Sequence, residues 1–207
     1  MKNSLFLFFL FQFSFNICNS QPIVAEGFVG ANNYKYQHML LRYFSAETRF
    51  GYFNSSSLQV FNRGKRSSEA MTQSYIIYKL SSFFNLGAGT FYATGAGFRP
   101  SVTLQFAHKT NDFFYVFSPR VDYNRQVAGE LMILIEYRPS IAGSVHLYTR
   151  LNAMSNYGRS HNRSFQNLVV GVDWKNTQFG IGIMFDEWGK TFEVERNWGF
   201  LLKKELF

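Results

Sequence analysis

Residues 129–138 read GELMILIEYR, and this stretch decides the fold class. Its odd positions from Leu131 onward carry only apolar side chains, whereas Glu130, Glu136 and Arg138 occupy even positions. Side chains of a β-strand point alternately to its two faces, so this segment is predicted to be a strand with one apolar and one charged face. Such a strand separates apolar surroundings from polar ones.

The same alternation recurs along the chain. Apolar side chains take most second positions in 101–108, 144–154, 166–174 and 178–186, opposite polar, charged or glycine residues. The repeated unit, about ten residues, is the length that a tilted strand needs to cross a bilayer. The segment 21–207 has no apolar run near the roughly 20 residues of a transmembrane helix. The pattern therefore predicts an all-β chain folded as a transmembrane, antiparallel, up-and-down β-barrel.

The hairpin pattern sets the number of strands at 10 or 12. The shorter count starts at residue 48, and 21–47 can add one N-terminal hairpin made of 23–30 and 35–44. The other strands are predicted at 48–61, 70–80, 84–94, 101–108, 113–122, 129–138, 144–154, 165–174, 178–186 and 196–207. Links are expected to alternate strictly between short turns and longer polar loops, as at the two ends of a membrane barrel. The longer loops are expected at 62–69, 94–100, 124–128, 155–164 and 187–196.

A water-soluble β-sandwich or lipocalin-like barrel is the rival fold, since it would also alternate, but with its apolar face inward. The placement of glycine and charge discriminates between the two. Here the non-apolar faces mix Gly, Ser and Asn with opposite charges on consecutive strands. That mixture suits a crowded interior better than a solvated exterior, so the membrane barrel is favoured.

The first 20 residues are predicted to be a cleaved signal peptide. A short basic start is followed by 5–15, which is almost unbroken Leu and Phe, and then by small residues at Cys18 and Ser20. Cleavage after Ser20 leaves 21–207, which is long enough for one domain and short for two. The alternative is a lipid-modified Cys18, which is disfavoured because the two residues before it are not small.

Composition narrows the class of protein further. Cys18 is the one cysteine of the sequence, so 21–207 holds no thiol, and this argues against a disulfide-stapled module. Removing Lys2 from the formal charge of +8 leaves +7, spread without any basic run of the kind that binds nucleic acid. No cluster with metal-ligand spacing occurs, so neither a metal nor a cofactor is expected. The aromatic fraction of 19%, with 25 Phe, suits lipid-facing girdles.

The C-terminal segment carries a family resemblance. The chain stops on Phe207 at the end of a predicted strand, and this resembles the terminal signature of small Gram-negative outer-membrane β-barrel proteins. The resemblance implies a multi-pass barrel in the cell outer membrane, in contact with outer-membrane lipid and lipopolysaccharide, and inserted by the barrel-assembly machinery. Narrow oligosaccharide-specific channels of about twelve strands are one similar subgroup. The sequence departs from the signature because the apolar residues Trp198, Phe200 and Leu202 do not share the parity of Phe207.

The charged faces of the strands supply the candidate site, because charges at membrane depth are expected in the lumen. The candidates for lining it are Arg42, Arg120, Asp122, Glu130, Glu136, Arg138, His146, Arg150 and Asp173, with Asp186, Lys203 and Glu205 on the same parity. In one interpretation the four arginines form a basic track that attracts anions. In the other they pair with carboxylates on neighbouring strands and close the lumen.

The predicted function is passive: a porin-like, narrow pore for small solutes, with anionic solutes as the favoured class. The first alternative is a closed structural or adhesion barrel that binds partners through its outer loops. The second is a hydrolase at the outer rim, for which His161 and the hydroxyls around it in 158–164 are the one hint. That segment is more simply interpreted as an exposed polar loop facing lipopolysaccharide. No catalytic residue and no nucleic-acid partner are expected, and a monomer is favoured.

Overall fold

The computed structural model describes residues 23–62, 66–123 and 127–206, and these residues form antiparallel β-strands without any helix. The strands are β1 Ile23–Gly30, β2 Asn33–Tyr43, β3 Phe50–Phe61, β4 Glu69–Lys79, β5 Phe84–Ala93, β6 Gly97–Lys109, β7 Phe113–Asp122, β8 Ala128–Tyr137, β9 Ser140–Ala142, β10 Val145–Tyr157, β11 His161–Trp174, β12 Thr177–Trp188 and β13 Glu193–Leu206. Within these ranges there is no helix long and apolar enough to cross a membrane.

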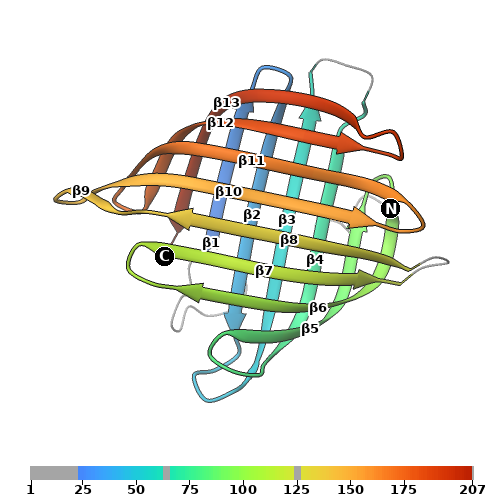
Figure 1. The fold of residues 1–207 in the computed structure, drawn as a ribbon. Coiled ribbons are helices and arrows are strands. Elements are labelled where there is room, and N and C mark those ends of the chain that lie inside the picture. The colour runs from blue at the N-terminus through green and yellow to red at the C-terminus, as the bar shows by residue number, and fades with distance from the viewer. Residues whose placement is uncertain (1–22, 63–65, 124–126, 207) are drawn as a thin grey trace, which may run out of the picture.

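The strands close into a barrel of 12, and β9 is a short extension of the hairpin between β8 and β10. Closure depends on β1, which pairs with β13 from Ile23↔Leu206 to Gly30↔Gly199 and with β2 on its other edge. In Figure 1 the strands β7 to β13 of the near wall run across β1 to β4 of the far wall, as tilted strands of a closed barrel do. The all-β barrel is confirmed, and the count is twelve because the N-terminal hairpin belongs to the wall.

The barrel wall is apolar on its outer face and polar on its inner face, which is the reverse of a soluble barrel. On β13 the outward Trp198 and Phe200 are each 63% exposed, whereas the inward Leu201 and Lys203 are 2% and 4% exposed. The buried set elsewhere is rich in charged and amide side chains. An apolar exterior around a polar interior is what a barrel in lipid requires. Trp198, Phe200 and Leu202 face outward on β13. This outward position explains why their parity differs from that of the C-terminal family signature.

The links differ from the expected strict alternation, and that prediction is wrong. The "proximal end" of the barrel is the one where β1 begins and β13 ends, and the "distal end" is the opposite one. At the distal end 94–96, 158–160 and 189–192 are short turns, because β6, β10, β11 and β13 extend into the segments expected to be long loops. The inward polar side chains of these segments bond to partners across the lumen. The polar composition of the segments was therefore not a sign of a loop. The predicted signal peptide, residues 63–65 and 124–126, and Phe207 lie outside the described residues.

Candidate functional site: a lumen chamber between two layers of ion pairs

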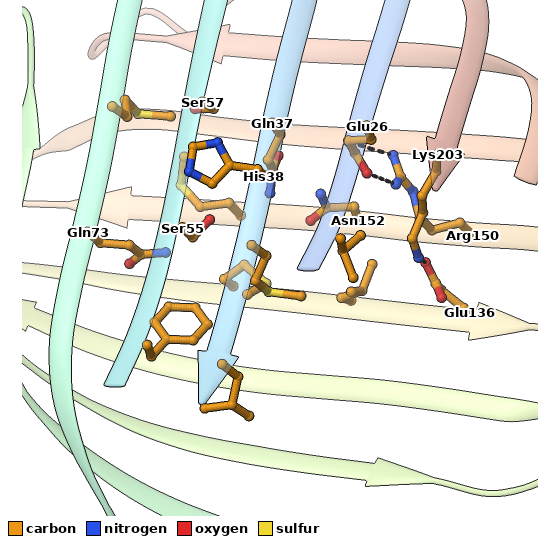
Figure 2. A pocket seen from close by; sticks show the side chains of 18 of the residues that line it. Glu26, Gln37, His38, Ser55, Ser57, Gln73, Glu136, Arg150, Asn152 and Lys203 are labelled. Carbon is orange, nitrogen blue, oxygen red and sulfur yellow. Dashed lines mark hydrogen bonds and ion pairs between the residues drawn. The ribbon is translucent and has the colours of Figure 1, made fainter. Parts of the chain in front are cut away.

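The middle of the lumen holds a cavity of about 460 Å³, which we call the chamber. Inward positions of β2, β3, β4, β5, β8 and β10 supply much of its wall, and Figure 2 shows side chains of both walls pointing into it. A large part of this wall is apolar, with the side chains Met39, Phe53, Met71, Phe91, Met132 and Met154. The chamber therefore has a large apolar surface together with hydrogen-bonding side chains such as Gln37, Ser55, Gln73 and Asn152, inside a lumen whose ends are charged.

A first layer of ion pairs lies at the proximal end and is centred on Glu136. This carboxylate is fully buried, accepts hydrogen bonds from the Arg138 guanidinium and the Lys203 ammonium, and accepts another from the Tyr148 hydroxyl at 2.9 Å. Arg138 also reaches Glu205 at 2.8 Å and, on β11, Asp173. Burial lowers the pKa of the Arg138 guanidinium, but the carboxylates of Glu136 and Glu205 outweigh this and hold that pKa above its ordinary value. The layer joins β8 to β13 across three intervening strands.

Arg150 and Glu26 form a second link across the lumen, next to this layer. The Arg150 guanidinium on β10 donates to both carboxylate oxygens of Glu26 on β1, and both side chains are almost completely buried. Figure 2 shows this pair beside the Lys203–Glu136 pair. Paired, hydrogen-bonded charges are the form in which charges persist in a buried environment.

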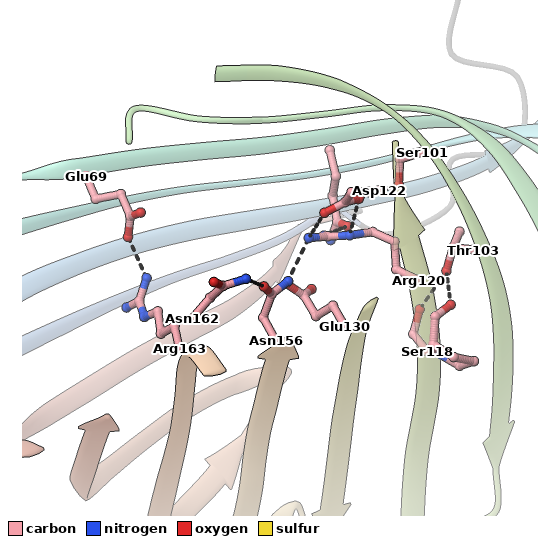
Figure 3. Close-up of polar contacts among 12 residues, drawn as sticks. Glu69, Ser101, Thr103, Ser118, Arg120, Asp122, Glu130, Asn156, Asn162 and Arg163 are labelled. Atoms are coloured by element: carbon pink, nitrogen blue, oxygen red, sulfur yellow. Dashed lines mark hydrogen bonds and ion pairs between the residues drawn. The ribbon is translucent and has the colours of Figure 1, made fainter. Parts of the chain in front are cut away.

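The other layer lies at the distal end, and its first half is centred on Arg120 (Figure 3). The Arg120 guanidinium pairs with Asp122 at 2.9 Å and with Glu130 at 2.8 Å, and it donates to the Gln73 side chain at 3.0 Å. Asn156 donates a further hydrogen bond to Glu130. Both carboxylates on this side are therefore occupied by the chain's own donors.

The second half of the distal layer crosses the barrel through Arg163. Its guanidinium pairs with Asp186 at 2.7 Å, with Glu69, and with the Gln59 side chain at 2.9 Å. Strands β11 and β4, which carry Arg163 and Glu69, are separated by five strands in either direction around the barrel. The pair thus bridges opposite walls and narrows the distal end of the lumen.

The predicted lumen residues meet in these layers, with one exception. Arg120, Asp122, Glu130, Glu136, Arg138, Arg150 and Asp173 all have inward partners, and His146 lies at the proximal hairpin with Nδ1 3.3 Å from the Arg138 carbonyl. Arg42 differs: its neighbour Tyr43 packs inward against Phe53 and Tyr75, so alternation places Arg42 on the outward face. Its assignment to the lumen and to a basic track is corrected accordingly. The remaining three arginines are ion-paired, so they form no continuous track.

Several lumen residues were absent from the sequence-based set, among them Glu26, Lys35, Glu69 and Arg163. Glu69 and Arg163 fell in segments interpreted as loops, and Glu26 and Lys35 in the uncertain N-terminal hairpin. The signal that could have found Lys35 is its shared parity with Asn33 and Gln37, which are polar residues on one face of β2.

The unpaired charges that face the chamber are cationic. Each carboxylate of its lining, Glu26, Glu130, Glu136 and Glu205, has an ion-pair partner. Among the described residues, no carboxylate lies within ion-pair distance of Lys35 or Lys109, which also line it. Lys35 is 8% exposed, with its Nζ 4.8 Å from the centre of the Phe165 ring. The chamber therefore offers positive charge to a solute.

His161 and Ser164 form a separate polar pair at the distal end of the outward face. His161 is 5% exposed, which corrects its interpretation as part of an exposed loop. Its Nδ1 lies 2.7 Å from the Gly189 carbonyl, which can only accept, so Nδ1 carries the proton and Nε2 accepts from the Ser164 hydroxyl at 2.9 Å. Ser164 Oγ is also 2.7 Å from Ser155 Oγ, and the Phe192 ring stacks on His161.

No group of three or more His, Cys, Asp or Glu side chains among the described residues could hold a metal ion.

Comparisons of sequence find no matching family model and no matching curated protein. Solved structures do match. "KdgM porin" gives a TM-score of 0.51 at 16% identity, covering 88% of this chain and 98% of that one. "NanC porin" gives 0.52 at 11% identity, covering 91% and 100%. "KdgM porin in complex with disordered oligogalacturonate" gives 0.50 at 14% identity, covering 90% and 100%. The chain thus has the barrel fold of outer-membrane porins.

Proposed function

We propose that this protein is a narrow, passive pore for small solutes in the outer membrane. The observation that carries the proposal is a closed barrel with an apolar exterior and, inside its charged lumen, a chamber of about 460 Å³. The likeness to porins of the same fold supports it. The ion-pair layers act as the constrictions at either side of the chamber.

The proposal includes an orientation in the membrane. It puts the proximal end, which holds both Ile23 and Leu206, at the periplasm and the distal end outside. The outward apolar band contacts lipid, and lipopolysaccharide meets the distal rim. Insertion uses the barrel-assembly machinery acting on β13, and the protein functions as a monomer.

Solute selection in this proposal depends on the lysines of the chamber and not on the arginines. Arg120, Arg138 and Arg150 are held by carboxylates, whereas no carboxylate among the described residues forms an ion pair with Lys35 or Lys109, so these two can attract an anion. Low-dielectric walls strengthen the field of such a charge in a narrow space. Small anions are therefore the favoured solutes.

Single-channel recording in a planar bilayer tests the pore. The refolded protein is expected to open in discrete steps and to prefer chloride over potassium, and Lys35→Gln should reduce that preference. Lys204→Gln is the matched control, because Lys204 alternates with the inward Lys203 and bonds at the rim to Thr177 and the Lys175 carbonyl. A folded barrel that never conducts would contradict the pore and favour the closed structural or adhesion barrel.

A second candidate function, ester hydrolysis at the outer rim, is favoured by one observation. In the Ser164–His161 pair the histidine is oriented by a carbonyl and accepts from a hydroxyl, which is the arrangement of a nucleophile and its general base. The porin-like fold and the near-complete burial of Ser164 weigh against it.

Release of nitrophenol from a p-nitrophenyl ester, and of fatty acid from phospholipid in mixed micelles, tests this candidate. A hydrolase should lose its activity in Ser164→Ala and in His161→Ala, while Ser155→Ala retains it. We expect no release above that of protein-free micelles, and release that depends on Ser164 would overturn that expectation.

A further inference from the structure

We infer that the chamber binds an amphipathic organic anion: an apolar or aromatic body joined to one carboxylate or similar anionic group. This deepens the proposed pore function by naming the chemical class of its solute. The inference rests on the apolar wall of the chamber and on the unpaired ammonium of Lys35, which are independent features of the lumen.

The apolar wall selects the body of the solute. Met39, Met71, Met132 and Met154 approach the chamber from both walls of the barrel, with Phe53 and Phe91 beside them. Thioether side chains adapt to irregular apolar shapes and make favourable contacts with aromatic rings. Hydroxyls held against these six side chains would lack hydrogen-bond partners and would be costly to bury, whereas Gln37, Ser55 and Gln73 in the same lining can bond to a few polar groups of a solute. The wall therefore suits a body whose surface is mostly apolar.

Lys35 selects the anionic group. Its side chain is more than nine-tenths buried on the inward face of β2, and its ammonium lies over the Phe165 ring without an ion-pair partner among the described residues. The nearby Glu26 is already engaged by both ends of the Arg150 guanidinium. A buried cation without a paired anion is costly, and a bound carboxylate would remove that cost.

The size of the chamber limits the solute. A cavity of about 460 Å³ is in the range of sites for small organic molecules. The distal Arg120–Glu130 pair and the proximal Glu136–Lys203 pair both line the chamber, so charged groups border a bound molecule at both ends. One or two fused rings, or a short alkyl chain, with a single charged group fit this description.

Isothermal titration calorimetry on the refolded protein in zwitterionic detergent micelles, with protein-free micelles subtracted, tests the inference. The probes are naphthalene-2-carboxylate, naphthalene-2-methanol with the same body but no charge, and galacturonate with charge but no apolar body. The carboxylate should bind at one site about tenfold more tightly than the alcohol, as a charge-assisted hydrogen bond predicts, and also about tenfold more tightly than galacturonate, which buries no apolar body.

Lys35→Gln should remove the advantage of the carboxylate and leave the affinity for the alcohol unchanged. Met132→Asn should lower the affinity for both naphthalene ligands. Lys204→Gln, outside the lumen, should bind as the unaltered protein does. Absence of saturable binding, equal binding of galacturonate, or an unchanged carboxylate affinity in a folded Lys35→Gln barrel would each overturn the inference. The binding assay does not depend on conduction, so the two proposals can fail separately. A barrel that binds the carboxylate but never conducts would uphold this inference and contradict the pore. A barrel that conducts but does not bind the carboxylate would overturn this inference and leave the pore intact.

Discussion

Replacing Glu69 and Arg163 together by glutamine is expected to raise the single-channel conductance severalfold. The ion pair between them joins β4 to β11 on opposite walls, so it limits the cross-section at the distal end of the lumen. Two glutamine side chains are not drawn together across the lumen by opposite charges as Glu69 and Arg163 are. Water and ions can then pass between them. Recording in a planar bilayer under equal salt on both sides measures the change.

Arg163→Gln alone leaves both Glu69 and Asp186 without their cation, whereas the double variant leaves only Asp186 uncompensated, and each uncompensated buried charge costs about 3–5 kcal/mol. The matched control is Glu187→Gln with Arg196→Gln. It also removes one charge of each sign near the distal end, from positions whose parity faces outward. Equal conductance in the two double variants would show that the bridge is not the constriction.

The architecture could be predicted from the sequence because it depends on a local property. Alternation over about ten residues places Leu131 and Glu130 on opposite faces whatever the strand pairs with. The N-terminal hairpin was the weak point, because twelve strands leave the chain few residues for its loops. Its membership of the barrel follows from β1 closing on β13, which is a contact between the two ends of the chain.

The arrangement of the charges could be predicted only in part. Parity placed Arg120, Glu130 and Glu136 in the lumen, but it carries no information on which residue lies across from which. Arg163 meets Glu69 because opposite walls of a closed barrel approach each other, and the local sequence of β11 does not encode that distance. For the same reason the sequence could not show that Lys35 keeps an unpaired charge while the arginines are neutralised.

Glu136→Leu is expected to lower the free energy of unfolding by about 3–5 kcal/mol, the cost of removing one partner from a buried ion pair. The substitution keeps the side-chain volume close to that of Glu but leaves the Arg138 guanidinium without one of its carboxylates, the Lys203 ammonium without its ion pair, and the Tyr148 hydroxyl without its acceptor. Urea unfolding of the refolded barrel in micelles, followed by tryptophan fluorescence, measures the loss. Glu205→Gln is the control, because Arg138 then retains Glu136 and Asp173 and the loss should stay near 1 kcal/mol, about the worth of one such contact.

A second variant separates the charge from the shape of the site. Lys203→Met combined with Glu136→Leu removes both members of the buried pair, so the double variant should be more stable than Glu136→Leu alone. Arg138 remains paired with Asp173 and Glu205 in that background. If the double variant were instead less stable by the sum of the two single losses, the proximal layer would stabilise the barrel through packing and not through charge pairing. Recovery in the double variant would mean that Glu136 is needed chiefly because Lys203 is buried beside it, which makes the layer a neutral seal at the proximal end of the chamber.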